Sequence, residues 1–309
     1  MTKQIYKKGI SKMNFFTIIA APFGYLISWL YSLTNNYLLA VLGTAIVFNI
    51  CFIWTDIIKR RSAKKLASML PDIIKIQQKY PNAQINKKEK EKMNKEITEV
   101  YNKNNYTGAT TFILPVITFV TNIIFFTAVI NPLVYISGLD VDTINNFKDA
   151  FMNAGIEING YTQFGIVNLI NNTDMLNTVA SIVPNVQELI IPNLQFGVLN
   201  LGETPSFSWP VIILPIIMTL STLIPIITSK KITINDFKNF NYSSFTKILL
   251  NSFSVFVTCL ISFKLPVLIC IYWLFRMILN IIKSNAFKVI DKIKNRKECL
   301  ETELQTKKV

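Results

Sequence analysis

Apolar residues are concentrated in five long stretches of the chain, with polar segments between them. The stretches cover residues 38–57, 111–135, 208–228, 248–263 and 266–282. About 20 helical residues are needed to cross a hydrocarbon core of about 30 Å, so the pattern predicts about five membrane-spanning helices. Only Lys264 and Leu265 separate the last two stretches, which predicts a tight helical hairpin with Pro266 at the start of the last helix.

The net charge of the polar segments alternates in sign along the chain. Residues 58–105 carry 13 Lys and Arg against 5 Asp and Glu, whereas residues 136–206 carry one Lys against 7 acids. Residues 229–247 carry 4 basic residues against 1 acid, and the chain from Lys283 onward carries 8 against 4. Because Lys and Arg are retained on the cytoplasmic side, we expect residues 136–206 to be external and the C-terminus to be cytoplasmic.

A further apolar stretch, residues 13–33, follows four lysines near the N-terminus. It fits a sixth span with the lysines inside. It also fits a helix in the membrane interface, held by Tyr25, Trp29 and Tyr31. Removal as a signal peptide is the third alternative, although the stretch lacks a persuasive small-residue cleavage site.

The basic segment 58–106 has its own helical pattern. Apolar residues recur at helical spacing on both sides of a turn signal, Pro81-Asn82. This predicts an antiparallel pair of helices of about 20 residues each, joined by one narrow apolar seam and mobile relative to the spans. The chain is thereby divided into the following regions: 1–37, 38–57, 58–106, 107–135, 136–206, 207–228, 229–247, 248–283 and 284–309.

The composition is typical of a membrane protein and excludes several kinds of active site. The chain is 51% hydrophobic and 16% charged, whereas soluble domains carry about a quarter charged residues. There is no histidine, which excludes His-based triads and HExxH zinc sites. The four cysteines form no CxxC pair, and no GxxxxGK[ST] phosphate loop is present. We therefore expect no metal site, no cofactor and no enzymatic activity.

Polar side chains repeat at helical spacing inside four of the predicted spans. Such residues are costly in lipid and tend to face a protein interior or a watery cavity. The mid-span Arg276 costs about 2.5 to 3.5 kcal/mol, and it either snorkels to the cytoplasmic surface or serves such a cavity. A single Ser or Thr more often bonds to its own helix, and Asp56 is expected to be an interfacial ion-pair partner. The candidate groove residues are Asn49, Thr118, Asn122, Asn251, Ser254, Thr258, Tyr272, Arg276 and Asn280.

Four segments carry a resemblance to a known family. They are residues 22–38 (PFGYLISWLYSLTNNYL), 62–80 (SAKKLASMLPDIIKIQQKY), 196–215 (FGVLNLGETPSFSWPVIILP) and 263–273 (FKLPVLICIYW). In this order they resemble the YidC/Oxa/Alb family of membrane protein insertases. The resemblance implies an all-α polytopic membrane protein with a five-helix core, a cytoplasmic antiparallel helical hairpin and an N-terminal interfacial or sixth spanning helix. It also implies a hydrophilic groove that is open to the cytoplasm and to lipid but closed to the outside.

The function implied by the resemblance is insertion of newly made membrane proteins into the cell membrane, without nucleotide hydrolysis. Nascent membrane proteins are the expected partners, with a ribosome, a Sec translocon and anionic lipids at the cytoplasmic face as further candidates. Bacterial members keep an arginine in the first core span, where an ungapped count places Asn49 in this chain. We therefore expect Arg276, on a facing helix, to supply the positive charge. A small solute or ion transporter or channel is the alternative, which predicts an internal repeat and paired intramembrane acids that this sequence lacks.

Overall fold

The described part of the chain is mainly helical. The computed structural model describes residues 15–83, 85–107, 109–158, 160–172, 189–207, 209–228 and 255–306, with side chains except at 109–112, 223–228, 295 and 298–306. A two-stranded antiparallel hairpin is formed by β1 (Gln195–Phe196) and β2 (Leu199–Asn200). The helices are α2 (Phe15–Thr34), α3 (Tyr37–Cys51), α4 (Ile53–Lys79), α5 (Lys87–Lys103), α6 (Ala109–Val129), α7 (Pro132–Tyr135), α8 (Val141–Asn153), α9 (Thr162–Asn171), α11 (Ile213–Thr228), α13 (Val267–Thr306) and a helical segment over residues 255–262.

The apolar helices confirm the predicted fold class. Among the described residues, α2 and α13 are long and apolar enough to cross a membrane, and α3 with α4 makes a third candidate that is bent by 46°. α6 and α11 contain the shorter apolar stretches Ile113–Val129 and Ile213–Thr222. The protein is therefore an all-α polytopic membrane protein. Of the predicted fourth span, the structure describes residues 255–263.

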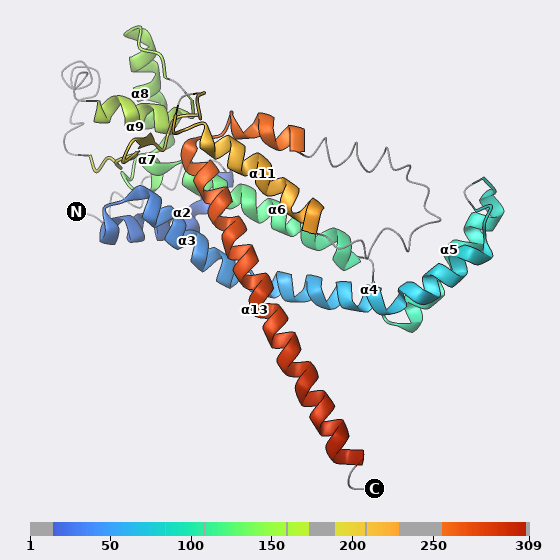
Figure 1. Ribbon diagram of the computed structural model, residues 1–309. Coiled ribbons are helices and arrows are strands. Elements are labelled where there is room, and N and C mark those ends of the chain that lie inside the picture. The colour runs from blue at the N-terminus through green and yellow to red at the C-terminus, as the bar shows by residue number, and fades with distance from the viewer. Residues whose placement is uncertain are drawn as a thin grey trace.

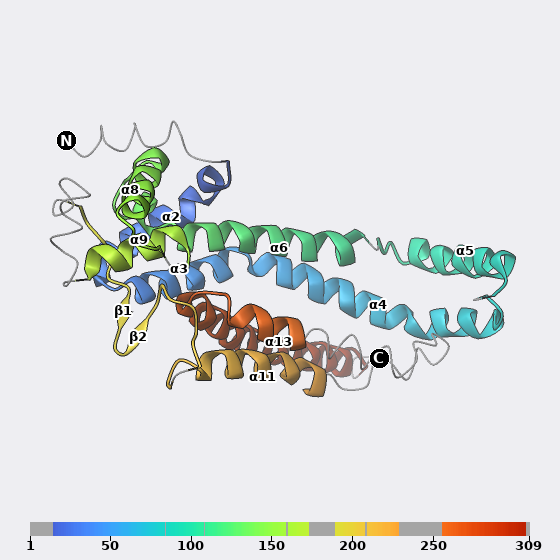
Figure 2. The ribbon, with the colours of Figure 1, turned by 90° about the horizontal axis from the view of Figure 1, so that it is seen from above.

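The helical bundle has two distinct ends (Figure 1). α7, α8, α9 and the β hairpin gather at one end, which we call the cap end. α4 and α5 extend from the opposite end, which we call the hairpin end (Figure 2). Between the two ends, α3 packs against α2 and α13, α6 packs against α2 and α4, and α11 packs against α13. α13 runs obliquely to α3 and α6 and continues beyond the bundle (Figure 1).

The first predicted span is not a single straight helix. α3 begins after Asn36, whose side-chain oxygen accepts a hydrogen bond from a first-turn N–H at 3.1 Å. The helix is interrupted at Phe52, and the Thr55 hydroxyl donates to the Phe52 carbonyl at 2.8 Å, a contact of the kind that bends helices. α4 then continues to Lys79, so the first arm of the hairpin is a continuation of the first span.

The two arms at the hairpin end pack through a narrow apolar seam, as the sequence predicted. Met69 of α4 is buried in a small cluster that includes Ile97 of α5. Near the turn, Glu96 Oε1 accepts hydrogen bonds from Lys79 Nζ at 2.6 Å and from the Tyr80 hydroxyl at 2.7 Å. The bond from Lys79, followed by that from Tyr80, lowers the pKa of the Glu96 carboxyl below its ordinary value.

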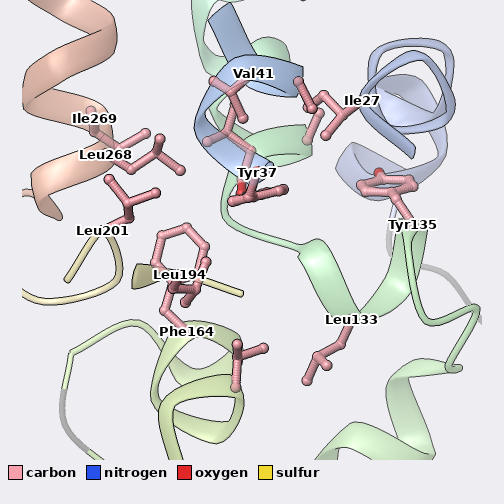
Figure 3. Close-up of a cluster of buried hydrophobic side chains, with 14 of the residues drawn as sticks. Ile27, Tyr37, Val41, Leu133, Tyr135, Phe164, Leu194, Leu201, Leu268 and Ile269 are labelled. Atoms are coloured by element: carbon pink, nitrogen blue, oxygen red, sulfur yellow. The ribbon is translucent and has the colours of Figure 1, made fainter. Parts of the chain in front are cut away.

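A large apolar core lies at the cap end (Figure 3). Tyr37, at the start of α3, is 1% exposed, and its hydroxyl donates to the Val129 carbonyl at the end of α6. The ring of Phe164 in α9 meets the Tyr37 ring edge-on, with the centroids 6.4 Å apart. Leu201 lies beside Leu268, whose N–H donates to the Leu201 carbonyl at 3.0 Å and thereby gains a partner that its own helix cannot supply. Residues of the acidic segment between α6 and α11 therefore complete the core at this end.

A buried amide fixes α9 against the end of α6. Gln163 Oε1 accepts a hydrogen bond from Leu133 N at 2.9 Å, and Gln163 Nε2 donates to Asn131 Oδ1 at 2.6 Å. The Gln163 side chain is buried, so both of these bonds replace bonds to water. The segment 136–206, whose role the sequence left open, is in its described part a packed cap on the helical bundle.

α2 packs against α3, α6 and α7. Gly24 lies against the ring of Tyr135, and the Tyr135 hydroxyl donates to the Thr17 carbonyl at 2.7 Å. α2 is long and apolar enough to span a membrane, and it also carries an exposed Trp29 that suits an interface. The spanning, interfacial and cleaved alternatives for this segment therefore stay predictions. The four lysines that precede it lie outside the described residues.

Candidate substrate-binding cavity

A polar cavity of about 350 Å³ lies between α3, α4, α6 and α13. Its lining alternates along these helices at intervals of three or four residues, so each helix turns one face to it. The apolar part of the lining consists of the phenyl rings of Phe48, Phe52 and Phe287. The charged part consists of four cations and one acid, a net formal charge of +3: Lys59, Arg60, Arg276, Lys283 and Asp56.

Lys283 is the cation that contacts the candidate residue Asn49. Lys283 Nζ donates to Asn49 Oδ1 at 3.0 Å and to Asp56 Oδ2 at 2.7 Å. Asn49 Nδ2 donates to the Ala45 carbonyl of its own helix at 2.9 Å, which leaves Oδ1 for the lysine. The prediction that Asp56 forms an ion pair is confirmed, with Lys283 of α13 as its partner.

Arg276 is held by a neutral side chain. Its Nη1 donates to Oδ1 of Asn122 on α6, a contact that leaves the positive charge uncompensated. One turn nearer the cap end, the ring of Tyr272 stacks on that of Phe125 with the centroids 4.7 Å apart. The Tyr272 hydroxyl is buried near the Arg276 guanidinium, and it makes no hydrogen bond of standard geometry with the described residues. Because an unpaired buried hydroxyl is costly, a water or a polar ligand group beside it would be stabilised.

Ion pairs tie α4 to α13 at the hairpin end of the cavity. Arg60 and Lys64 of α4 both pair with Asp291 of α13, at 2.7 and 2.8 Å. On the other side of α4, Lys59 Nζ donates to Thr118 Oγ1 of α6 at 2.8 Å. α4 is thus bonded to both neighbouring helices through long side chains, which are partly exposed at this end of the cavity.

The structure brings most of the predicted groove residues together. Asn122 lies beside the cavity, because it accepts a hydrogen bond from Arg276 in the lining. Tyr272 also lies beside the cavity, one turn from Arg276 along α13. Thr258 is buried on the helical segment 255–262 and is outside the lining. Asn251 and Ser254 lie outside the described residues. Four of the candidates line the cavity directly: Asn49, Thr118, Arg276 and Asn280.

The sequence argument left out the charged residues at the hairpin end of the cavity. Lys59 and Arg60 were considered only as cytoplasmic charges beside Asp56, and Lys283 was placed on the polar stripe of the last span but was not named as a groove residue. The helical spacing supports both lysines as lining residues, since Lys59 follows Asn49 by 10 residues and Lys283 follows Arg276 by 7. Unless it is known which helices face one another, the charged residues of a cytoplasmic loop cannot be distinguished from those that line a cavity.

The comparison with known families covers most of the chain. Residues 29–295 match the model of the family described as 60Kd inner membrane protein. No curated protein and no solved structure matches the chain significantly. The matched region contains α3, α4, α5 and α6 in full and α13 up to residue 295, and thus every residue that lines the cavity. The chain belongs to the 60Kd inner membrane protein family, which is the YidC/Oxa/Alb family of membrane protein insertases.

Proposed function

We propose that the cavity between α3, α4, α6 and α13 receives the polar segments of newly made membrane proteins, so that they enter the bilayer without nucleotide hydrolysis. The family is one of membrane insertases, which supports the general role. The main observation in favour of a substrate groove is the cavity of about 350 Å³, which has a net formal charge of +3 and lies among apolar helices.

A wet, charged cavity lowers the barrier that a polar segment meets in lipid. A backbone amide without a hydrogen-bond partner costs several kcal/mol in hydrocarbon, at roughly 4 to 8 kcal/mol on the strictest scale. Asn280, Thr118 and the Tyr272 hydroxyl offer hydrogen bonds, and Arg276 and Lys283 offer charge-assisted ones. The apolar part of the substrate then partitions into lipid, and burial of its apolar surface drives release.

The cap end supports a groove that is closed on one side. Tyr37, Phe164 and Leu201 are each at most 1% exposed, and they belong to one continuous apolar core. Dense packing of these side chains excludes water from the core that they form. Loop charge supports placing the cap end outside and the hairpin end in the cytoplasm, because the hairpin carries the basic excess. The protein thus accepts substrates from the cytoplasmic side of the cell membrane.

The proposed partners follow from the same geometry. Nascent chains reach the cavity past α4 and α5, whose surface is rich in lysine. A positive surface there attracts polyanions such as ribosomal RNA and anionic lipid. A Sec translocon is a further proposed partner, which rests on the membership of the insertase family alone.

The proposal is tested by insertion into liposomes that hold the purified protein and no nucleotide. Two single-span substrates are compared, one with an acidic translocated segment and one with a neutral segment. We expect Lys283→Gln and Arg276→Gln each to lower insertion of the acidic substrate about tenfold, because a hydrogen bond to a charged group contributes about 1.5 to 3 kcal/mol. The matched control is Lys264→Gln, an exposed lysine just before α13 and away from the cavity, which should insert both substrates normally.

A second control separates groove charge from stability. Lys283→Gln leaves Asp56 without its partner, whereas Lys283→Gln combined with Asp56→Asn removes the whole pair. The double variant should fold like the wild type and still insert the acidic substrate poorly. Normal insertion of both substrates by all variants would contradict the proposal. Solute flux without insertion would instead favour a transporter.

A further inference from the structure

α13 is longer than a span needs to be. It covers 40 residues, Val267–Thr306. At about 1.5 Å per residue it is about 60 Å long, against about 30 Å for a hydrocarbon core. Figure 1 shows that α13 leaves the bundle obliquely and continues past it. The sequence predicted a separate basic tail from residue 284, whereas in the structure residues 284–306 belong to the same helix as the span.

One face of this extension is polar and contacts α4. Lys283 contacts α3 and α4, and two turns later Asp291 pairs with Arg60 and Lys64 of α4. Between them, the Phe287 ring lies 4.7 Å below the Arg60 guanidinium. Lys283, Phe287 and Asp291 are each four residues apart, so one face of the helix is turned toward α4.

A different face of the extension is apolar and exposed. Ile282, Val289 and Ile293 are 58%, 58% and 52% exposed, and they recur at intervals of seven and four residues. Ile290 adjoins them and is also exposed. The same stripe begins inside the span, where Ile278 is exposed on a helix long and apolar enough to cross a membrane. The part of the stripe within the span faces lipid, and the extension continues that lipid-facing side.

Basic residues flank this apolar stripe on both sides. On a helical projection at 100° per residue, Arg296 and Lys292 lie about 20° and 60° beyond Val289 on one side, and Lys297 lies about 40° beyond Ile293 on the other side, between Ile293 and Ile290. All three side chains are exposed. An apolar face with flanking Lys and Arg is the pattern of helices that lie in the membrane interface, where cations meet lipid phosphates. Binding to a helical protein partner would require no such basic border.

We infer that residues 284–297 of α13 bind the surface of the leaflet at the hairpin end and take anionic phospholipid as their ligand. Val289, Ile290 and Ile293 lie below the level of the phosphates. Lys292, Arg296 and Lys297 bind the phosphate groups. The lipid thereby holds α13 from one side while α4 holds it from the other.

The test measures the depth of spin labels in the full-length protein reconstituted in vesicles, with the four native cysteines replaced by alanine. One label is placed at Ile293 and a matched label at Lys288, which is exposed about 140° away around the helix. Vesicles of phosphatidylcholine alone are compared with vesicles that also contain phosphatidylglycerol. In the anionic vesicles, the label at 293 should be more accessible to oxygen than to a water-soluble nickel chelate, and the label at 288 should show the reverse.

The charged flank is tested by Lys292→Gln, Arg296→Gln and Lys297→Gln combined. Each cation near an anionic surface shifts such an equilibrium by about fivefold, so the label at 293 should move toward water in anionic vesicles. Unchanged circular dichroism and insertion of a neutral substrate show that the variant folds. A label at 293 that stays in water in every vesicle would overturn the inference, as would one that becomes protected only when ribosomes are added. Neither result depends on the cavity, so failure here leaves the insertase proposal intact.

Discussion

Gly24→Ala should destabilise the protein through a single added methyl group. A Cβ at this position would lie less than 3.0 Å from three ring carbons of Tyr135, a separation that real Cβ atoms do not show. Tyr135 is 1% exposed and its hydroxyl is bonded to the Thr17 carbonyl, so the ring cannot swing away. α2 must therefore move relative to α7.

The magnitude follows from three contributions. Overpacking of a dense core costs about 1 to 3 kcal/mol. Loss of the bond between Tyr135 and Thr17 costs about 1 kcal/mol more. Replacing a helical glycine by alanine returns about 1 kcal/mol. We therefore expect a net loss of about 1 to 3 kcal/mol, which lowers the melting temperature by several degrees.

Gly43→Ala is the matched control, since Gly43 is also a helical glycine packed against a neighbouring helix, here where α3 meets α2. The Cβ added there would meet the Leu30 Cδ1 atom at 3.0 Å, the flexible end of a partly buried side chain. The helix gains about the same 1 kcal/mol, which the tight contact with Leu30 partly offsets, so the melting temperature should not fall below that of the wild type. The assay is thermal unfolding of the purified protein in detergent, followed by circular dichroism. Equal melting temperatures for Gly24→Ala and Gly43→Ala would refute the placement of α2 against Tyr135.

Two further predictions concern the hairpin end and the cap. The Glu96 pKa is lowered by bonds from Lys79 and Tyr80, so this contact stabilises the hairpin above the ordinary pKa of a glutamate and is lost as the pH falls through the lowered pKa. Distances between spin labels on α4 and α5 should therefore broaden in acid, and Glu96→Gln should show the broad distribution already at neutral pH. In the cap, Gln163→Leu leaves the buried Leu133 N–H without a partner, which should cost about 1 to 3 kcal/mol and make the cap sensitive to proteolysis. A protease cleavage pattern like that of the wild type would contradict the hydrogen bonds described for the Gln163 side chain.

Much of the fold could be predicted from short-range patterns in the sequence. Apolar runs of span length predicted a polytopic helical protein, and Pro81-Asn82 between two stripes predicted the antiparallel hairpin. The bend at Phe52 was missed, because the residues around it are as apolar as those of a continuous span. The cap was missed for the opposite reason. Its buried residues, such as Phe164 and Leu201, are separated by polar segments and have no apolar run that marks them as core.

The same distinction between local patterns and long-range packing applies to the polar residues. Helical phase is a property of one helix, so the sequence alone could place Asn49, Thr118, Arg276 and Asn280 on polar faces. It could not say which faces meet. Whether Arg276 or Lys283 lies against Asn49 depends on the tilt and rotation of α13 relative to α3, which long-range packing sets.

The sequence by itself thus determined the class of protein and the sign of the charge on each connecting segment, because hydropathy and charge act locally and add along the chain. Only the tertiary structure decided that the acidic segment between α6 and α11 forms a packed cap, that Lys283 contacts Asn49 and Asp56, and that α13 continues in one piece to Thr306. These features depend on contacts between residues up to 234 positions apart, and no local pattern encodes the partner of such a contact.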